Sequence, residues 1–291
     1  MTDTAPSRPV LRYHGGKWML APWILEHFPP HRIYTEVFGG AASLLMRKPR
    51  ARLVEVYNDL DGEIVSLFRV LRDPGTAGAL REVLRYTPFA RAEFALSYQS
   101  TEDPIEQARR TVVRSFFGFG SDSASGATTG FRANGNRQNA HPARDFANYP
   151  EAMEAFTARL AGVVVENRPA IEIILQHDTP ETLHYCDPPY AHASRSENTV
   201  RTGKGYRHEL TDDDHRKLAE VLHEAAGMVA VSGYRCDLYD DLYGDWEAKD
   251  RKAIADGGPF APALERTEVL WLNQACVAAL NAARQQERLF A

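Results

Sequence analysis

The chain has 291 residues, of which 44% are hydrophobic and 25% are charged, and its formal net charge is −5. These fractions are ordinary for a globular protein, and no apolar stretch approaches the roughly 20 residues that a membrane-spanning helix needs. The amino terminus lacks the basic and apolar regions of a signal peptide, so we expect a cytoplasmic protein without a membrane partner. The negative charge argues against nonspecific coating of nucleic acid, although local basic patches remain able to bind a polyanion.

Cysteine and histidine do not form a recognisable metal-binding pattern. Cys186, Cys236 and Cys276 are isolated, odd in number and not at metal-ligand spacing. We therefore expect them to be reduced thiols in the core. His215 and His223 stand eight residues apart on one expected helix, which is too far for a shared site. The sequence predicts no metal site.

Strand-like hydrophobic runs alternate with helical periodicity over most of the chain. The expected strands cover residues 32–37, 53–57, 163–166, 183–186, 228–232 and 269–272. The expected helices cover residues 41–48, 64–71 and 169–177, and a further helix begins at the capping-box-like run 211–214. In the 169–177 helix, Ile171, Ile174 and Leu175 are expected to share the buried face. This alternation indicates a parallel, doubly wound α/β sheet.

Residues 76–148 do not fit that alternation. They read as two helices, at 77–86 and 104–116, followed by a stretch rich in Gly, Ser, Thr, Asn and Ala. Such a segment between two sheet units indicates an inserted, mainly helical subdomain, which leaves residues 1–75 and 149–291 to form the sheet domain. A second irregular stretch, 191–209, has the composition of a lid.

The tetrapeptide Asp187-Pro188-Pro189-Tyr190 directly follows an expected buried strand. Two consecutive prolines cannot continue a strand ladder, and proline disfavours the helical region for the residue before it. The chain therefore holds a carboxylate, a carbonyl and an aromatic ring at the carboxyl end of a strand, where ligands bind in open α/β sheets. This combination suits a flat heterocycle that bears an amino group. The alternative is a simple Asp-Pro turn with a packed tyrosine.

A second group of residues follows the first and second expected strands. The run Glu36–Gly40 occupies the first strand-to-helix turn, where glycines let the backbone approach a ligand and the helix offers free N–H groups. Asp59 ends the second strand about 20 residues later, a position from which an acid commonly accepts hydrogen bonds from ribose hydroxyls. The alternative for Asp59 is an N-cap of the next helix. Together these residues predict a nucleoside-type ligand.

The loop Tyr13–Lys17 precedes the first expected strand. It is not a phosphate-binding Walker loop, because the first glycine of that motif is missing at the required spacing and Trp18 replaces Ser or Thr. Lys17 is instead placed to meet a carboxylate. The alternative is an ordinary surface turn.

In this order, the loop Tyr13–Lys17, the turn Glu36–Gly40, the run Tyr57–Asp59 and the tetrapeptide Asp187–Tyr190 resemble motifs of the Dam-type (D12 class) adenine-N6 DNA methyltransferases. The similarity extends to Ser232-Gly233-Tyr234 and Arg266-Thr267-Glu268, and thus covers most of the chain. The resemblance implies a Rossmann-like methyltransferase sheet that carries an inserted target-recognition subdomain. It also implies transfer of a methyl group from S-adenosylmethionine to adenine N6 in duplex DNA, without a metal.

The resemblance further implies roles for single residues. Tyr13 and Lys17 are expected to contact the methionine end of S-adenosylmethionine, Asp59 its ribose, and Asp187 both cofactor and target base. The other expected cofactor-binding residues come from the first turn, and they are Glu36, Phe38, Gly39 and Gly40. Many relatives have tryptophan in place of Tyr13, and either ring can pack on the cofactor.

The residue types at the target base indicate a mechanism. Asp187 and the Pro188 carbonyl are expected to accept both hydrogens of the N6 amino group, which favours a more nucleophilic nitrogen. They also stabilise the positive charge that develops on it. Tyr190 is expected to stack on the base, which must leave the duplex to be reached.

The inserted subdomain carries the residues expected to hold duplex DNA. Its basic side chains are all arginines, whose planar fork suits phosphate and guanine contacts. About half of them are expected only to pair with nearby acids, namely Glu82, Glu93, Glu106 and Asp145. The least obviously paired, and therefore the expected DNA contacts, are Arg91, Arg114, Arg132 and Arg137. The run Phe116–Phe119 is expected in the core rather than as a wedge between bases.

Two alternatives remain open. Cytosine N4 is a similar exocyclic amine, and pocket shape, which the sequence does not show, decides between it and adenine N6. A catalytically silent DNA- or cofactor-binding module is the alternative from a different class, and the intact Asp187 and Tyr190 argue against it. The sequence also leaves open a cognate restriction endonuclease as a partner, and a monomeric or homodimeric state.

Overall fold

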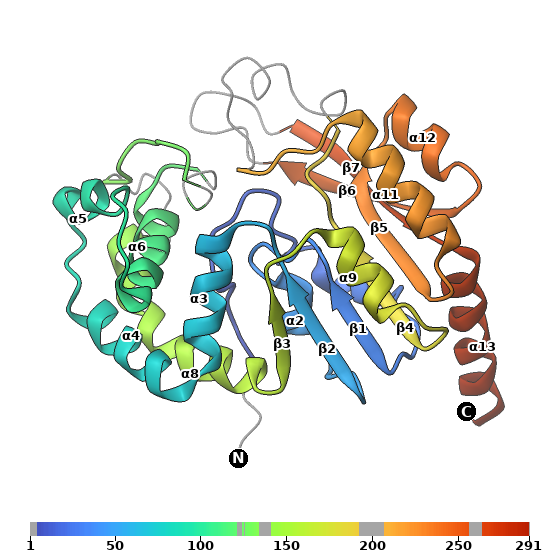
Figure 1. Cartoon of the computed structure of the whole chain (residues 1–291), viewed down its shortest axis with the longest axis horizontal. Coiled ribbons are helices and arrows are strands. Elements are labelled where there is room, and N and C mark those ends of the chain that lie inside the picture. Colours follow the sequence, from blue (N-terminus) through green and yellow to red (C-terminus); the bar gives the residue numbers. More distant parts are fainter. Residues whose placement is uncertain are drawn as a thin grey trace.

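A central sheet is the frame of the computed structural model, which describes residues 5–120, 124, 126–133, 141–191, 207–255 and 264–290 (Figure 1). Within those residues the sheet has seven strands in the order β3-β2-β1-β4-β5-β7-β6. The strands are β1 (Ile33–Glu36), β2 (Val54–Asn58), β3 (Val163–Glu166), β4 (Thr182–Cys186), β5 (Met228–Tyr234), β6 (Glu247–Ala255) and β7 (Leu264–Leu272). Strands β1 to β5 pair in parallel, so the predicted doubly wound sheet is confirmed.

One edge of the sheet differs from the sequence expectation. β7 runs antiparallel to both β5 and β6, so the sheet is mixed rather than wholly parallel. The sequence analysis does not predict β6, because the run Glu247–Lys252 is almost entirely charged and shows no hydrophobic alternation. Charged side chains are common on edge strands, where they discourage pairing with another chain.

Helices cover both faces of the sheet, and a separate group of helices stands beside β3 (Figure 1). One face carries α1 (Ala21–Leu25), α2 (Ser43–Arg47) and α13 (Gln274–Phe290), and the other carries α9 (Ala170–His177), α11 (Asp212–Glu224) and α12 (Asp237–Tyr243). The helical group consists of α4 (Pro74–Tyr86), α5 (Arg91–Leu96), α6 (Pro104–Phe117), α7 (Pro142–Ala147) and α8 (Tyr149–Leu160). Helix α3 (Gly62–Arg72) contacts β3 on one side and α6 and α8 on the other. None of the described helices has the length and apolar character needed to cross a bilayer.

Each central strand supplies side chains to two hydrophobic cores, because successive residues point to opposite faces of the sheet. In β5, Met228 and Ala230 join the core beneath α1, α2 and α13. Val229 and Val231 join the core beneath α9, α11 and α12. Burial on both faces explains why these strands read as continuous hydrophobic runs in the sequence.

The helical group has an aromatic centre of its own. Phe117 of α6 is fully buried and packs against three further rings of this group, those of Phe89, Phe131 and Phe146. Phe116 is also buried, so the expectation of a core role is confirmed for both, whereas Phe119 is 49% exposed. The helices of this group continue to Leu160, beyond the predicted end of the insert at residue 148.

The local signals of the sequence are mostly confirmed, with one exception on α9. The capping box is present, since the Thr211 hydroxyl accepts from the Asp214 N–H and the Asp214 carboxylate accepts from the Thr211 N–H. The predicted buried face of α9 is partly wrong, because Leu175 is 65% exposed and Ile173 is buried together with Ile174. Each residue advances about 100° around a helix, which turns Leu175 away from the sheet when Ile174 faces it.

A buried ion network joins the helical group to the sheet. Glu55 of β2 is 5% exposed and accepts hydrogen bonds from Arg159 of α8 at 2.7 and 2.9 Å. The same carboxylate accepts from Lys48 Nζ, just beyond α2, at 2.7 Å. Because one carboxylate serves two buried cations, its loss leaves both without their counter-charge.

Glu55→Gln should therefore lower the free energy of unfolding by roughly 3–5 kcal/mol, the range for removing one partner of a buried ion pair. Glutamine keeps the side-chain volume, so packing changes little. Urea unfolding followed by circular dichroism measures the effect. The matched control is Glu181→Gln, whose pair with Arg32 is about half exposed on both sides and should be worth about 1 kcal/mol or less. Equal unfolding midpoints for the two variants would contradict this prediction.

Candidate active site

A hollow of the described residues lies where the strand order reverses. The chain proceeds from β1 outward to β2 and β3, then returns to β4 on the other side of β1, so β1 and β4 flank a topological switch point. Open α/β sheets bind ligands at this position, beyond the carboxyl ends of the strands. The pocket holds about 770 Å³, its open mouth included, and is lined by the runs 13–17, 36–41 and 59–61 together with Asp187 and Arg207.

The turn after β1 is shaped by two glycines packed against two tyrosine rings. A Cβ on Gly39 would lie 2.2 Å from the Tyr57 ring, and one on Gly40 would lie 2.7 Å from the Tyr13 ring. Gly40 also has a φ of +46°, which side chains rarely tolerate. The Tyr57 hydroxyl donates to the Gly40 carbonyl at 2.8 Å and fixes the turn from below. The turn thus leaves open backbone and the Tyr13 ring at the pocket wall.

Asp59, which follows β2, joins the turn after β2 to the turn after β1 by hydrogen bonds. Its Oδ2 accepts from the Gly40 N–H at 2.8 Å, and its Oδ1 accepts from the Asp61 N–H at 2.8 Å. Asp61, not Asp59, caps α3 by accepting from the Glu63 N–H at 3.0 Å. The N-cap alternative for Asp59 is therefore wrong. Burial raises the pKa of Asp59, while the two N–H donors lower it in part.

Asp61 presents an unsatisfied oxygen in the pocket wall. The residue is 2% exposed, and its Oδ2 has no hydrogen-bond partner among the described residues. Its Oδ1 lies 3.0 Å from Arg207 Nη1, and Arg207 also pairs with Glu63 at 3.1 Å. Arg207 belongs to the stretch predicted as a lid, of which residues 192–206 lie outside the described part of the chain.

Lys17 also lines the pocket. Its Nζ lies 2.9 Å from Asp187 Oδ1 and 3.5 Å from Glu268 Oε1, and it donates to the Gly15 carbonyl at 2.9 Å. The Lys17 side chain is 5% exposed, whereas Gly15 and Gly16 are exposed, so the loop turns at the surface and directs its lysine inward. Lys17 does meet a carboxylate, as its position suggested, but the carboxylates present are the protein's own.

Tyr190 stands over this lysine. Its ring centroid lies 4.9 Å from Lys17 Nζ, and its hydroxyl donates to Glu268 Oε1 at 2.5 Å. The edge of the ring meets Tyr234 at a centroid distance of 4.7 Å. Burial raises the pKa of both Asp187 and Glu268, and the Lys17 ammonium lowers both in part. The sequence analysis gives Glu268 no role, although a carboxylate beginning the apolar run 268–272 was an available signal.

Glu36 supports the pocket floor from the end of β1. Its Oε2 accepts from the Tyr34 hydroxyl at 2.8 Å and from the Leu45 N–H of α2 at 2.7 Å. Burial raises the pKa of Glu36 to about 7, although both hydrogen bonds oppose the shift. Phe38 lines the same pocket, so every residue predicted to bind the cofactor lies at one site.

Comparison with known proteins decides which family this pocket belongs to. A sequence model of the D12 class N6 adenine-specific DNA methyltransferases matches residues 13–256. The chain belongs to this family. It is also 24% identical over 236 residues to proteins named DNA adenine methylase from two Vibrio cholerae serotype O1 strains, classical Ogawa and El Tor Inaba. The match covers 77% of this chain and 79% of each relative.

Membership of the D12 class fixes the reaction at the level of the modified atom. The chain is a DNA adenine methyltransferase that acts on N6 of adenine. The cytosine-N4 alternative and the silent binding module are both dropped on this ground. The expectations of a Rossmann-like methyltransferase fold and of DNA adenine methylation are confirmed.

Of the four arginines expected to contact DNA in this D12 enzyme, the structure describes Arg91, Arg114 and Arg132, and their surroundings differ. Arg91 is exposed at the start of α5, with its guanidinium 4.9 Å from the Phe131 ring centroid, and Arg132 is half-buried. Arg114 is 3% exposed, forms an ion pair with Glu63 and donates to the Ser97 carbonyl. A buried, paired guanidinium does not reach a phosphate, so Arg114 is withdrawn from the set. Arg137 lies outside the described residues.

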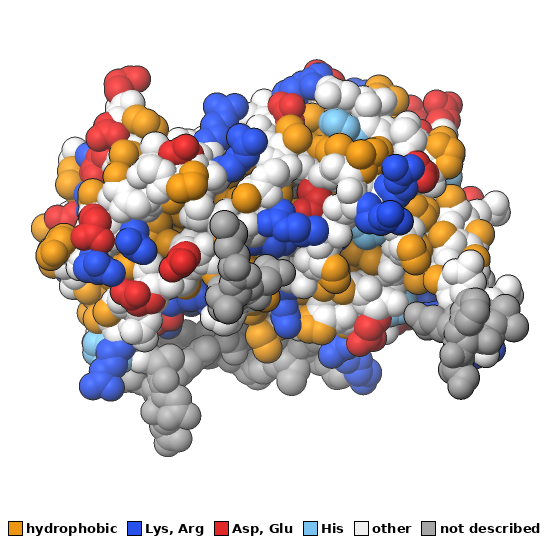
Figure 2. All heavy atoms as spheres, turned by 90° about the horizontal axis from the view of Figure 1, so that it is seen from below, with side chains coloured by type: hydrophobic (Ala, Val, Ile, Leu, Met, Phe, Trp, Pro, Cys, Tyr) orange, Lys and Arg blue, Asp and Glu red, His pale blue; other side chains and the backbone are white. Residues whose placement is uncertain are grey.

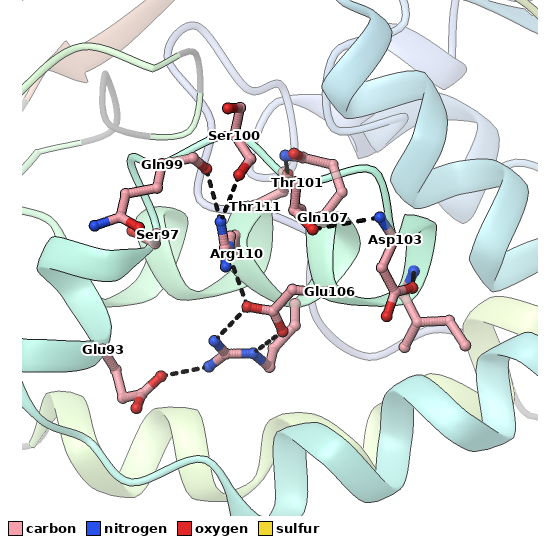
Figure 3. Close-up of polar contacts among 12 residues, drawn as sticks. Glu93, Ser97, Gln99, Ser100, Thr101, Asp103, Glu106, Gln107, Arg110 and Thr111 are labelled. Carbon is pink, nitrogen blue, oxygen red and sulfur yellow. Dashed lines mark hydrogen bonds and ion pairs between the residues drawn. The ribbon is translucent and has the colours of Figure 1, made fainter.

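Several other arginines of the helical group are paired, as expected. Arg109 binds Glu93 and Glu106, and Arg110 binds Glu106 and the carbonyls of Gln99 and Ser100 (Figure 3). This network joins α5 to α6 and holds the loop between them. Within the described part of the chain, Asp145 pairs with Arg8 of the amino-terminal segment rather than with an arginine of the insert. On the face drawn in Figure 2, basic and acidic side chains are interleaved instead of gathered in one patch.

Glu36→Gln should change how stability depends on pH. Because the pKa of Glu36 in the folded protein is about 7 against an ordinary 4.5, the native state binds this proton more tightly than the unfolded chain. Stability from this group therefore falls as pH rises from about 4.5 to 7. The unfolding free energy of the wild type minus that of the variant should fall by about 3 kcal/mol across this window. Urea unfolding at several pH values measures the difference, and parallel curves for the two proteins would contradict the assigned shift.

Proposed function

We propose that this enzyme transfers the methyl group of S-adenosylmethionine to adenine N6 in duplex DNA, at the pocket between the ends of β1 and β4. The observation that carries the proposal is the position of Asp187. Its carboxylate follows β4 directly, lines the pocket and is held by Lys17 at 2.9 Å. An acceptor fixed at this edge fits an amino group brought to a bound methyl donor.

The residues present fit S-adenosylmethionine. The bare turn Gly39-Gly40 and the Tyr13 ring line the pocket, and a flat ligand suits such a wall. The unsatisfied Oδ2 of Asp61, together with Asp59, suits the hydroxyl or amino donors of a nucleoside. S-adenosylmethionine supplies a methyl group already activated on a sulfonium. Asp59, Asp61 and the first turn are the residues that we propose hold it, with Glu36 and Phe38 completing the pocket.

The chemistry at the base follows from what Asp187 and its neighbours accept and donate. The Asp187 carboxylate and the Pro188 carbonyl accept the two N6 hydrogens, which makes the nitrogen a better nucleophile and stabilises its developing positive charge. Burial raises the pKa of Asp187, and the Lys17 ammonium lowers it in part and so favours the ionised form that can accept. Tyr190 offers its ring to the base after the base has left the duplex.

We propose that the helical group beside β3 is the target-recognition subdomain, so that the predicted insert 76–148 binds DNA beside the pocket. Support comes from the side-by-side position of the group and the sheet (Figure 1) and from the ion pair of Arg114 with Glu63 on α3. Arg91 and Arg132 remain the proposed contacts within the described residues. Duplex DNA is the only macromolecular partner that this proposal requires.

Asp187→Ala should reduce methyl transfer by several orders of magnitude, because the buried site loses the acceptor that activates the amine. Asp187→Asn should be less severe, since its amide oxygen still accepts one hydrogen bond. Single-turnover transfer of labelled methyl from S-adenosylmethionine to adenine-containing duplexes measures both. Duplexes in which N6-methyladenine replaces adenine serve as the substrate control. Near-native turnover by the alanine variant would remove Asp187 from the mechanism.

Arg91→Ala and Arg132→Ala should weaken DNA methylation in one of two recognisable ways. Loss of a guanine contact relaxes specificity at one position at a cost of about 1–3 kcal/mol. Loss of a phosphate contact weakens all sequences alike and flattens the salt dependence. The matched control is Arg85→Ala, since Arg85 already pairs with Glu82 and Glu151 on the surface. The measurement is methylation of single-base-variant duplexes at two salt concentrations, and native behaviour in both test variants would place DNA recognition elsewhere.

A further inference from the structure

Glu268 is a buried carboxylate that the mechanism above does not use. It is 2% exposed in β7, where it pairs in register with Tyr234 of β5 and Arg251 of β6. The four residues that follow it, Val269 to Leu272, are all buried and apolar. Burying a carboxylate in such a strand is costly unless its oxygens find close partners.

The partners of Glu268 are two of the residues that we propose above to act at the target base. Its Oε1 accepts from the Tyr190 hydroxyl at 2.5 Å and lies 3.5 Å from Lys17 Nζ. Lys17 in turn lies 2.9 Å from Asp187. One ammonium therefore stands between two carboxylates, and only one of the two borders the pocket.

We infer that Glu268 is a positioning residue for methyl transfer, acting through Tyr190 and Lys17 on the pocket that we propose above. By accepting from the hydroxyl, it holds the Tyr190 ring at a fixed angle against Tyr234. By lying 3.5 Å from Lys17 Nζ, it holds the ammonium beside Asp187, where the positive charge favours the ionised form of the carboxylate that accepts from the amine. Glu268 itself touches neither the base nor the methyl donor.

The proposed role of Glu268 gives the Tyr190 hydroxyl a function in positioning the ring. If the ring only stacked on the base, Tyr190→Phe would keep nearly full activity, because a phenyl face stacks as well. With the hydroxyl bound to Glu268 at 2.5 Å, removing that oxygen frees the ring and leaves a buried carboxylate without its closest donor. Tyr190→Phe and Glu268→Gln therefore damage the same contact from its two sides.

The test compares Glu268→Gln, Tyr190→Phe and the double variant by single-turnover methyl transfer at saturating S-adenosylmethionine and DNA. Each single variant should lose roughly 10- to 100-fold in rate, less than the roughly 100- to 1,000-fold loss on removing a group that contacts the reacting atoms, because Glu268 acts through other residues. The double variant should be no slower than the slower single, because coupled partners are not additive. Calorimetric affinity for S-adenosylmethionine should change by less than about threefold, since a positioning effect of this kind alters kcat more than ground-state binding.

Glu55→Gln is the control for stability, since it removes another buried carboxylate of the sheet, away from the pocket, and should keep the wild-type rate while folded. A wild-type rate in Glu268→Gln or in Tyr190→Phe would overturn the inference, as would multiplicative losses in the double variant. Tyr190→Phe keeps the test decisive if Glu268→Gln does not fold. If the wild type itself transfers no methyl group to adenine, the proposed function fails. If it does and the variants match it, only the role of Glu268 fails.

Discussion

The pocket depends on one ion, the ammonium of Lys17, which joins three distant parts of the chain. The loop before β1 supplies the lysine, the end of β4 supplies Asp187, and β7 supplies Glu268. Neither carboxylate is favourable in a buried, low-dielectric site without that cation, and the cation is equally unfavourable without them. The three segments must therefore meet for any of them to be stable in place. The prolines shape the tetrapeptide Asp187–Tyr190, and the Lys17 ammonium lowers the pKa of its carboxyl against the effect of burial.

A second junction connects this pocket to the helical group. Glu63, in the first turn of α3, forms ion pairs with both Arg114 of α6 and Arg207. Asp61, which caps the same helix, pairs with Arg207 as well. Acidic groups are favoured at a helix amino terminus, so α3 can hold two carboxylates there. One helix end thus touches the proposed cofactor wall, the proposed DNA-binding group and the end of the stretch predicted as a lid. A movement of any of these three parts therefore changes the ion pairs of Asp61 or Glu63, which the other parts also contact.

The parts of this fold that the sequence predicted are those governed by local periodicity and by buried parallel strands. The strands ending at Glu36, Asn58 and Cys186 carry hydrophobic runs because both of their faces are covered, and each run is followed by a motif residue at the switch point. β6 was missed because an edge strand tolerates charge, and Leu175 was misplaced because periodicity alone does not set the phase of a short helix. Glu268 and the pairing of Arg114 depend on contacts between segments far apart in the sequence. No spacing rule encodes such contacts.

The withdrawal of Arg114 changes the electrostatic account of DNA binding. Arg85, Arg109, Arg110 and Arg114 all have carboxylate partners inside the protein, so much of the positive charge of the helical group is used for its own cohesion. Phosphate contacts need basic side chains that are free to reach DNA and displace its condensed counterions. Guanidiniums that are already paired inside the protein supply few such contacts. With a net charge of −5, the chain then requires basic groups from outside this set. The stretch 191–209 contains Arg195, Arg201 and Lys204 in its sequence, besides Arg207, which is paired with Asp61 and Glu63. We therefore expect DNA recognition to be divided between the helical group and this stretch.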